Sequence, residues 1–333
     1  MVKTKKILTI IIQLSAVILF LASILSIFRN TENRYLKMLD FPRIQLFILS
    51  IILIILLLIA EGKRKWLKKL LVSGLLIGIA IQSYFLINYT TLVPVEVPTA
   101  KHVKGRDNQF SLLLTNVKMS NRKAPQLIEL IASKKPDLVL AMEVDSWWHD
   151  ELNTLTNDYP FSHHAINEET YGMVLYSKLA LKKIEVNYLT NEKVPSFESI
   201  ITFEDGKNFS FHAVHPVPPT HFQELPDNAG EQENALKKLG KKVEGREHPI
   251  LVAGDFNDVV WSYVDDLTGT KNSLYDLRVG RGFYNSFNAN NFLMRWPLDH
   301  VLVTDEFNLK KLERLSKIGS DHFPMYVELI LVD

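Results

Sequence analysis

The chain of 333 residues contains no cysteine, and this absence excludes several kinds of chemistry. Disulfide bonds, zinc–thiolate centres and thiol nucleophiles all require cysteine. The absence does not identify a compartment, because proteins without disulfides occur on both sides of membranes. An excess of either charge is also missing, since 38 basic side chains face 37 acidic ones. The resulting net charge of +1 provides no global attraction to nucleic acid.

Charged residues are absent from three long apolar runs in the N-terminal part of the chain, at residues 7–28, 44–60 and 70–87. At 1.5 Å per residue, helices of this length approach the thickness of about 30 Å of a hydrocarbon core. Helices buried in a soluble core would carry polar faces that these runs lack. We therefore predict three transmembrane helices in a membrane anchor over residues 1–89, with the lipid bilayer as partner. The first run could instead be a signal peptide, although it is long and no clear small-x-small cleavage site follows it.

Lysine and arginine near the ends of the runs predict the orientation of the anchor. The N-terminal tail and the loop between the second and third runs are the most basic flanks, with Lys3, Lys5, Lys6, Lys63, Arg64, Lys65, Lys68 and Lys69. The opposite side carries Arg29, Arg34, Lys37 and Arg43. This bias predicts a multi-pass protein of the cell inner membrane with its large domain on the extracytoplasmic side. Residues 90–107, which include Pro94 and Pro98, are expected to form an extended linker.

Residues 108–333 alternate short apolar runs with amphipathic segments. Helical spacing predicts two helices, Ala124–Ser133 and Glu231–Val243. Strands are expected at Gln109–Val117, Asp137–Met142, Met173–Tyr176, Ile184–Tyr188, Ser199–Phe203, Phe209–Val214, Ile250–Ala253, His300–Val303 and Met325–Leu331. Many strands and few helices favour an α/β domain in which two sheets form a sandwich flanked by helices.

The most informative segment is L-V-A-G-D-F-N-D, at residues 251–258. A buried run ends in a glycine, and Asp255 and Asn257 follow two positions apart. Residues two apart in an extended strand point the same way, so the carboxylate and the amide would face one spot at the rim of a sheet. Oxygen ligands of this kind suit a hard divalent cation or a phosphate site. A strand followed by an Asx turn is the alternative.

Further polar residues lie at the ends of other predicted strands, where catalytic groups often occupy the edge of a rigid sheet. They are Asn116, Glu143, His215, Asp299, Ser320, Asp321 and His322. Each could have an ordinary structural role, such as a turn cap or a buried histidine, but together they predict a site. Asp299 and His322 flank two strands that follow one another in the prediction, and pairing of those strands would bring the two side chains together.

In order along the chain, the motifs are T-N-V at Thr115, P-D-L-V-L-A-M-E-V at Pro136, V-H-P at Val214, G-D-F-N at Gly254, P-L-D-H-V-L-V at Pro297 and G-S-D-H-F-P at Gly319. This set resembles the endonuclease/exonuclease/phosphatase superfamily, the fold of DNase I, from about Gln109 onward. With its apolar N-terminal runs, the chain looks most like a bacterial membrane-anchored branch. One departure is Lys118, where many nucleases of the family carry an acid or an asparagine, and it makes a second metal site doubtful.

The resemblance implies a four-layered α/β-sandwich that hydrolyses a phosphodiester or phosphomonoester with Mg²⁺, or with Mn²⁺ in its place. By the same resemblance Glu143 is the principal metal carboxylate, Asn116 a nearby ligand of the metal or its water, and Asp321 a group on the metal side. Asp255 and Asn257 would orient the attacking water, and His215 would contact the scissile phosphate. His322 would pair with Asp299, and either His322 or Asp255 could be the general base.

The substrate is left open by the sequence. A membrane anchor favours a lipid head group or a small phosphoester as substrate. An extracytoplasmic nuclease acting on DNA or RNA is the alternative, with backbone contacts from Lys237, Lys238, Lys241, Lys242 and Arg246. A solvated helix face would explain the same lysines. A catalytically inactive, membrane-tethered binding module is a third hypothesis, which the complete polar set disfavours. The sequence implies no obligate protein partner.

Overall fold

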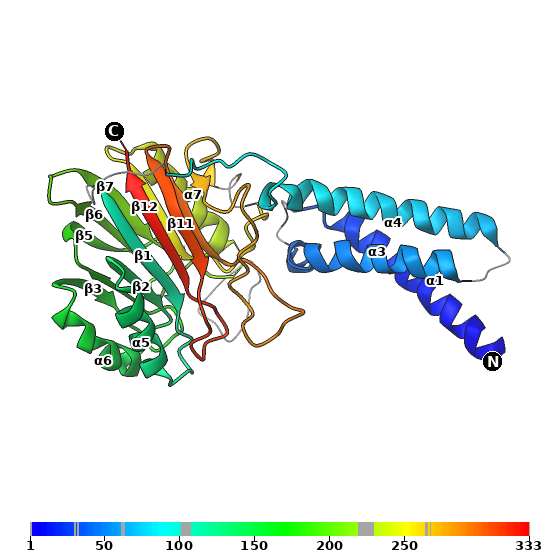
Figure 1. Ribbon diagram of the computed structural model, residues 1–333, viewed down its shortest axis with the longest axis horizontal. Coiled ribbons are helices and arrows are strands. Elements are labelled where there is room, and N and C mark those ends of the chain that lie inside the picture. The colour runs from blue at the N-terminus through cyan, green and yellow to red at the C-terminus, as the bar shows by residue number, and fades with distance from the viewer. Residues whose placement is uncertain are drawn as a thin grey trace. The chain divides into compact units, whose positions relative to one another are not determined.

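A computed structural model describes residues 2–332 except 30, 32, 61–63, 101–107, 219–229, 264–265 and 267 (Figure 1). The chain divides into two compact units, Met1–Leu92 and Val93–Asp333. Part of the segment that the sequence assigns to the linker packs on the second unit, because Val97 is buried in its core and Leu309 N donates to Pro98 O at 2.8 Å. The remainder of the predicted linker, 101–107, lies outside the described residues, as does Lys63 of the orientation argument.

The first unit is helical. Its long helices are α1 (Val2–Leu25), α3 (Arg43–Ile59) and α4 (Lys65–Leu86), and its short ones are α2 (Arg34–Lys37) and the 3₁₀ helices Met38–Asp40 and Ile87–Tyr89. Two stretches, Thr4–Leu25 and Lys65–Tyr89, are long and apolar enough to cross a membrane. A third span exists only if Arg34–Asp40 and Arg43–Ile59, bent by 71°, count as one. The described residues thus provide two or three candidate spans where the sequence predicts three.

Many apolar side chains of this unit face outward, whereas a polar group lies inside it. Ile18 and Ile59 are 64% and 73% exposed. By contrast, the guanidinium of Arg43 is fully buried and donates to Asp40 Oδ1 at 2.8 Å, to Gln82 Oε1 at 2.9 Å and to Ser26 O at 2.7 Å. These contacts connect α3 to the ends of α1 and α4, an arrangement suited to helices surrounded by an apolar solvent.

The second unit contains two six-stranded sheets. The first has the order β11-β12-β1-β2-β4-β3 and the second β5-β6-β7-β8-β10-β9. The strands of the first sheet are β1 (Gln109–Asn116), β2 (Leu138–Met142), β3 (Phe161–Ala165), β4 (Met173–Ser177), β11 (Phe307–Arg314) and β12 (Met325–Leu331). Those of the second are β5 (Ala180–Tyr188), β6 (Pro195–Thr202), β7 (Asn208–Ala213), β8 (Ile250–Asp255), β9 (Tyr275–Asp276) and β10 (Asp299–Val303).

The two sheets pack face to face, and helices cover their outer faces. Phe110 and Leu140 of the first sheet meet Phe209 and Val301 of the second in one buried cluster. Outside the first sheet lie α5 (Ala124–Lys134), α6 (Ser146–Leu152) and the 3₁₀ helix Asn153–Asn157, and outside the second lies α7 (Glu231–Glu244) (Figure 1). The α/β sandwich of two sheets flanked by helices is therefore confirmed, in four layers.

The order of the strands brings several strand ends to one edge. β1 is parallel to β2, and β7 is parallel to β8, so the carboxyl ends of each pair lie together. β10 runs antiparallel to β8 with Asp299 opposite Asp255. Gly254 allows this edge to close, since a Cβ atom there would lie 1.7 Å from Val214 O. The predicted site residues follow or begin these strands.

Candidate active site

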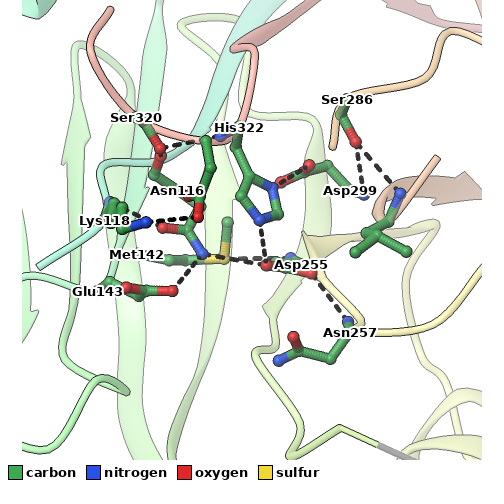
Figure 2. Close-up of polar contacts among 12 residues, drawn as sticks. Asn116, Lys118, Met142, Glu143, Asp255, Asn257, Ser286, Asp299, Ser320 and His322 are labelled. Carbon is green, nitrogen blue, oxygen red and sulfur yellow. Dashed lines mark hydrogen bonds and ion pairs between the residues drawn. The ribbon is translucent and has the colours of Figure 1, made fainter. Parts of the chain in front are cut away.

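Asn116 and Glu143 come from neighbouring strands of the first sheet. Asn116 ends β1 and is paired with Met142 of β2, and Glu143 follows directly with φ 59°. Asn116 Nδ2 donates to Glu143 Oε1 at 2.8 Å and to Asp255 Oδ2 at 3.0 Å. Glu143 Oε2 also accepts from Met119 N at 3.1 Å. The amide nitrogen of Asn116 therefore holds carboxylates from both sheets together, while its oxygen accepts from Lys118 N at 2.9 Å (Figure 2).

Asp255 and Asn257 do not converge as the strand pattern predicts. β8 ends at Asp255, and Asn257 has φ 53°, so the alternation of an extended strand does not reach it. Asn257 N donates to Asp255 Oδ1 at 2.8 Å, which is an Asx-type turn, and Asn257 Nδ2 donates to Pro216 O at 3.0 Å. The expectation that both side chains face one spot is wrong, because the backbone turns between them. The Asx turn, which the sequence analysis gave as the alternative to a functional site, is present here beside the candidate site.

His322 lies between two aspartates. Its Nδ1 is 2.8 Å from Asp299 Oδ2, and its Nε2 is 3.5 Å from Asp255 Oδ2. All three side chains are buried, and their ligand atoms lie within 4.8 Å of one another. Ser286 Oγ accepts from Asp299 N at 3.1 Å, and Ser320 Oγ accepts from His322 N at 3.0 Å, so both backbones are fixed (Figure 2).

The route by which His322 and Asp299 meet differs from the predicted one. The sequence argument requires pairing between the strands that they flank. Instead β10 pairs with β8 and β9 in the second sheet, whereas β12 pairs with β1 and β11 in the first. The two side chains meet across the sandwich, where the edges of the two sheets approach each other.

Two carboxyl groups of the cluster, those of Asp255 and Glu143, have raised pKa values. Burial raises the pKa of Asp255 to about 7, with Asp299 adding to the shift and His322 opposing it. Burial likewise raises the pKa of Glu143, which Asp321 also raises, against hydrogen bonds from Asn116 and Met119 N. Each of these carboxyls would ionise more readily if a cation were bound nearby.

The pKa values of His322 and His215 are shifted in opposite directions. Burial would lower the pKa of His322, but Asp299 and Asp255 raise it to about 10. The pKa of Asp299 is lowered, since the contacts with His322, Ser286 and Arg278 outweigh burial. His215, with Nε2 3.8 Å from Asp255 Oδ2, has its pKa lowered to about 3 by burial and by the charge of His322. At neutral pH His322 is an imidazolium and His215 a neutral imidazole.

Asp321 lies at the more exposed side of the cluster. Its Oδ2 is 2.7 Å from Lys118 Nζ, and the two side chains are 20% and 39% exposed. Lys118 thus places an ammonium group at the position where the family resemblance led us to doubt a second metal. The eight residues to which the resemblance assigns roles fall around one edge of the sandwich, although Asn257 turns toward Pro216 and Asp321 toward Lys118.

Sequence analysis missed three residues that hold this cluster in place, namely Arg278, Ser286 and Met142. Arg278 is 2% exposed and donates through Nη2 to Asp299 O. Ser286 fixes the start of β10, and Met142 Sδ accepts from Asp255 N at 3.1 Å. The signal for Arg278 was a lone arginine in the otherwise apolar L-R-V segment. For Ser286 and Met142 the sequence offers no such signal, because their roles arise from contacts between distant segments.

The donor set fits a divalent cation such as Mg²⁺. Glu143, Asp255, Asp299 and Asp321 supply oxygen, and the described residues include no thiol, as the sequence requires. Asp299 Oδ1 and His215 Nδ1 are buried without a hydrogen-bond partner among the described residues. Two carboxyls with raised pKa and an unsatisfied buried oxygen are what a cluster arranged for a cation would show.

These features define an α/β-sandwich of the DNase I-like class, with an acid–histidine cluster at one edge of its sheets. The model of the Endonuclease/Exonuclease/phosphatase family matches residues 113–322, and the chain belongs to this family. Members of the family are typically hydrolases of phosphoesters, and they typically depend on a divalent metal.

Particular relatives extend the comparison. A UPF0294 protein of Vibrio campbellii is 33% identical over 103 residues, which are 31% of this chain and 35% of that protein. The chain thus spans about a third of the length of that relative. Among solved structures, that of D. rerio TDP2 complexed with a single-strand DNA product has a TM-score of 0.56 at 16% identity, covering 67% of this chain and 99% of the chain in that structure. The human Nocturnin catalytic domain with bound sulfate has a TM-score of 0.54 at 16% identity, with coverage of 69% and 96%. At these identities the two structures establish the fold alone.

Proposed function

We propose that the protein is a membrane-anchored phosphoesterase that uses Mg²⁺ or Mn²⁺ to activate attack of water on a phosphodiester or phosphomonoester. The observation that carries the proposal is the set of half-buried Glu143 and buried Asp255, Asp299 and His322, which combines unneutralised acids with one fixed imidazolium. Phosphoryl transfer needs charge neutralisation and positioning more than covalent help, and this set can provide both.

Glu143 and Asp321 would hold the cation, with Asn116 orienting Glu143 through its amide nitrogen. When bound, the ion supplies positive charge to the phosphoryl oxygens and lowers the pKa of coordinated water. Residues of the protein itself would carry out the other steps. His322, kept protonated by Asp299, would donate from Nε2 to a phosphoryl oxygen, and neutral His215 would line the same place.

We assign the general base to Asp255 rather than to His322. A base works best when its pKa is near the working pH, and the pKa of Asp255 is raised to about 7. The pKa of His322, raised to about 10, leaves it without a free nitrogen at neutral pH. Asn257 N and Asn116 Nδ2 hold the two oxygens of Asp255 in place.

The apolar helices support the membrane part of the proposal, and the lysine bias supports an extracytoplasmic position of the domain. A reporter that is active only outside the cytoplasm, fused after Asp333, should give signal. A matched reporter that works only in the cytoplasm should be silent at the same point. The reverse pair of results would place the domain inside and contradict the orientation.

Nuclease activity is the second candidate, because TDP2, whose fold this chain shares, is seen with a DNA product. The lysines of α7 provide less support than the sequence suggested. Lys242 pairs with Glu198, Lys238 donates to Leu189 O, and Arg246 pairs with Glu306. Three of the five basic groups are thus engaged within the domain, which favours the solvated helix face.

One assay series separates these candidates. The full chain, purified in detergent, should be tested on phospholipids, sphingomyelin, single- and double-stranded DNA, RNA and nitrophenyl phosphoesters. Asp255→Asn should abolish hydrolysis of whichever substrate is found, and Asp158→Asn, an exposed carboxylate of the same domain, should leave it unchanged. Equal activity of Asp255→Asn and wild type would overturn the proposed site.

A further inference from the structure

The loop between Phe287 and Trp296 presents three consecutive large apolar side chains to solvent. Phe292 is 80% exposed, Leu293 73% and Met294 44%. Consecutive exposed apolar residues of this size are uncommon on soluble surfaces and mark a place of interaction. Elsewhere in the described part of residues 108–332, the large apolar side chains with high exposure are the single residues Phe161 and Tyr188.

The base of this loop is fixed to the candidate active site. Phe287 and Trp296 form an antiparallel bridge with stacked rings, and Phe287 also bridges to His322, its ring centroid lying 5.0 Å from the imidazole. Ala289 N donates to Asp321 O at 2.7 Å. The apolar tip therefore projects from a base that contacts His322 and Asp321.

Side-chain hydrogen bonds within the loop hold the shape of the tip. Asn291 Oδ1 accepts from Leu293 N at 2.9 Å and from Met294 N at 3.2 Å, and Asn288 Oδ1 accepts from Asn290 N at 2.7 Å. Two successive side-chain caps hold the turn that displays the apolar residues. A preformed tip loses less conformational entropy when it inserts into a partner.

Three basic side chains lie close to this loop, and between Asp276 and Asp299 the chain has no carboxylate side chain. The guanidinium of Arg295 lies 5.4 Å from the ring centroid of Phe292, and Arg314 lies beside Phe323 with Lys317 bonded to Asn290. Arg295 lies beside the apolar tip, while Arg314 and Lys317 lie near its base.

We propose that residues 292–294 insert into the apolar boundary of a lipid bilayer, with Arg295, Arg314 and Lys317 contacting lipid phosphates, and that this loop brings the active site to phosphoesters of lipid head groups. The inference rests on the proposed function, since it uses the same site and the same anchor. Apolar side chains flanked by arginine and lysine are the composition that binds membrane interfaces.

A bilayer fits these observations better than nucleic acid or a second copy of the chain. Nucleic acid would use the arginines but leave three apolar side chains without a partner. A second copy would need an acidic, apolar surface to match, whereas helices of the same chain are already long and apolar enough to cross a bilayer. The apolar tip and its cations match the two layers of a lipid surface, acyl chains and phosphates.

The chain has no cysteine, so one label can be placed without a background. Leu293→Cys should carry an environment-sensitive nitrobenzoxadiazole dye in the full chain, in single-protein nanodiscs of phosphatidylethanolamine and phosphatidylglycerol. Tyr188→Cys is the matched control, since Tyr188 is 51% exposed on β5, at the edge of the second sheet opposite β9. Lipids with a spin label high in the acyl chain should quench the dye at position 293 at least twofold more than at 188. Equal quenching at the two positions would overturn the insertion.

The activity of a second variant separates this inference from the proposed function. Replacing Phe292, Leu293 and Met294 by serine should lower kcat/KM tenfold or more for a phosphoester held in vesicles, chiefly through KM. Hydrolysis of soluble bis(p-nitrophenyl) phosphate should stay the same. Equal losses on both substrates, or none on vesicles, would overturn the role of the loop. If wild type hydrolyses no phosphoester, the proposed function fails while the quenching result still decides the insertion.

Discussion

Both units of the chain contain a buried polar cluster, and the two clusters are built differently. In the first unit the guanidinium of Arg43 meets Asp40, Gln82 and Ser26, and Asp40 also pairs with Arg29 at 3.3 Å. In the second unit four acids face one imidazolium and one partly exposed ammonium, that of Lys118. The first cluster has two guanidiniums for one carboxylate, whereas the second has an excess of negative charge.

The difference indicates what each cluster does. A buried guanidinium that is hydrogen-bonded to a carboxylate and to neutral groups fixes the packing of helices, because removing one partner leaves a buried polar group unsatisfied. A set of acids in excess of the nearby cations is kept only where something else completes it, and strongly shifted pKa values mark such places. Removing one residue should therefore harm folding in the first unit and chemistry in the second.

The largest effect should come from His322. His322→Ala should lower kcat on the order of 10²–10⁴, the range for a positioned acid–base or electrostatic group. Asp299→Asn should cost as much or less, and the double variant should be little worse than His322→Ala, because residues that act as a unit are not additive. Steady-state kinetics of the three variants checks this. Losses that multiply would show that the two residues act independently.

Arg43→Met should affect stability instead. Breaking a buried ion pair costs about 3–5 kcal/mol, so the helical unit should unfold at a lower temperature in detergent. Hydrolysis of a soluble phosphoester below that temperature should be unchanged, and Arg64→Met, at an exposed position, is the matched control. A stable Arg43→Met protein with impaired hydrolysis would remove the contrast between the clusters.

The stability of the metal-free protein should depend on pH mainly through the ionisation of His322. Because the folded-state pKa, about 10, exceeds the ordinary value of 6.5, the stabilisation is fully present below pH 6.5 and is lost as the pH rises through about 10. The pKa of Asp255 is raised from 3.8 to about 7, so the stability that its protonated form contributes is also lost as the pH rises, over this lower pH range. The midpoint temperature of unfolding, measured in EDTA, should fall as the pH rises from 6.5 to 9. It should fall less steeply in His322→Gln. A midpoint that rises over this range would contradict the assigned charge.

A smaller effect should follow from Lys118→Asn. The substitution removes an ammonium 2.7 Å from Asp321 Oδ2, so a divalent cation should bind more tightly. The gain should be a fewfold, on the order of 2–10, because the pair is partly exposed and screened. Isothermal calorimetry with Mn²⁺ compares the variant with wild type. Weaker binding by the variant would mean that Lys118 supports the metal site rather than competing with it.

The sequence predicted the sandwich and most of its elements, because buried strands such as β2 and β8 are short apolar runs with clear ends. It missed β3, which has exposed residues on both faces, and β11, where K-K-L-E-R hides the alternation behind a bulge. It also missed α6, which lies over the first sheet and contributes Trp148 to the core.

The site was predictable as a set of residues and less so as a geometry. Strand ends identify Asn116, Glu143, Asp255 and His322, but the turn at Asn257 depends on a positive φ that the pattern does not encode. The contact of His322 with Asp299 depends on how two sheets stack, not on which strands pair. Arg278 supports Asp299 through a long-range contact, and the arginine in the L-R-V segment does not indicate which residue it contacts.

The central claim is that the acid–histidine cluster is completed by a divalent cation and hydrolyses phosphoesters. The most direct measurement is hydrolysis of bis(p-nitrophenyl) phosphate by the full chain after exhaustive chelation, followed by titration with Mg²⁺ or Mn²⁺. Wild type should be inactive after chelation and recover with either ion, and Glu143→Gln should need a higher concentration of metal while keeping its fold. Full turnover in EDTA, or the same metal dependence in Glu143→Gln as in wild type, would contradict the account.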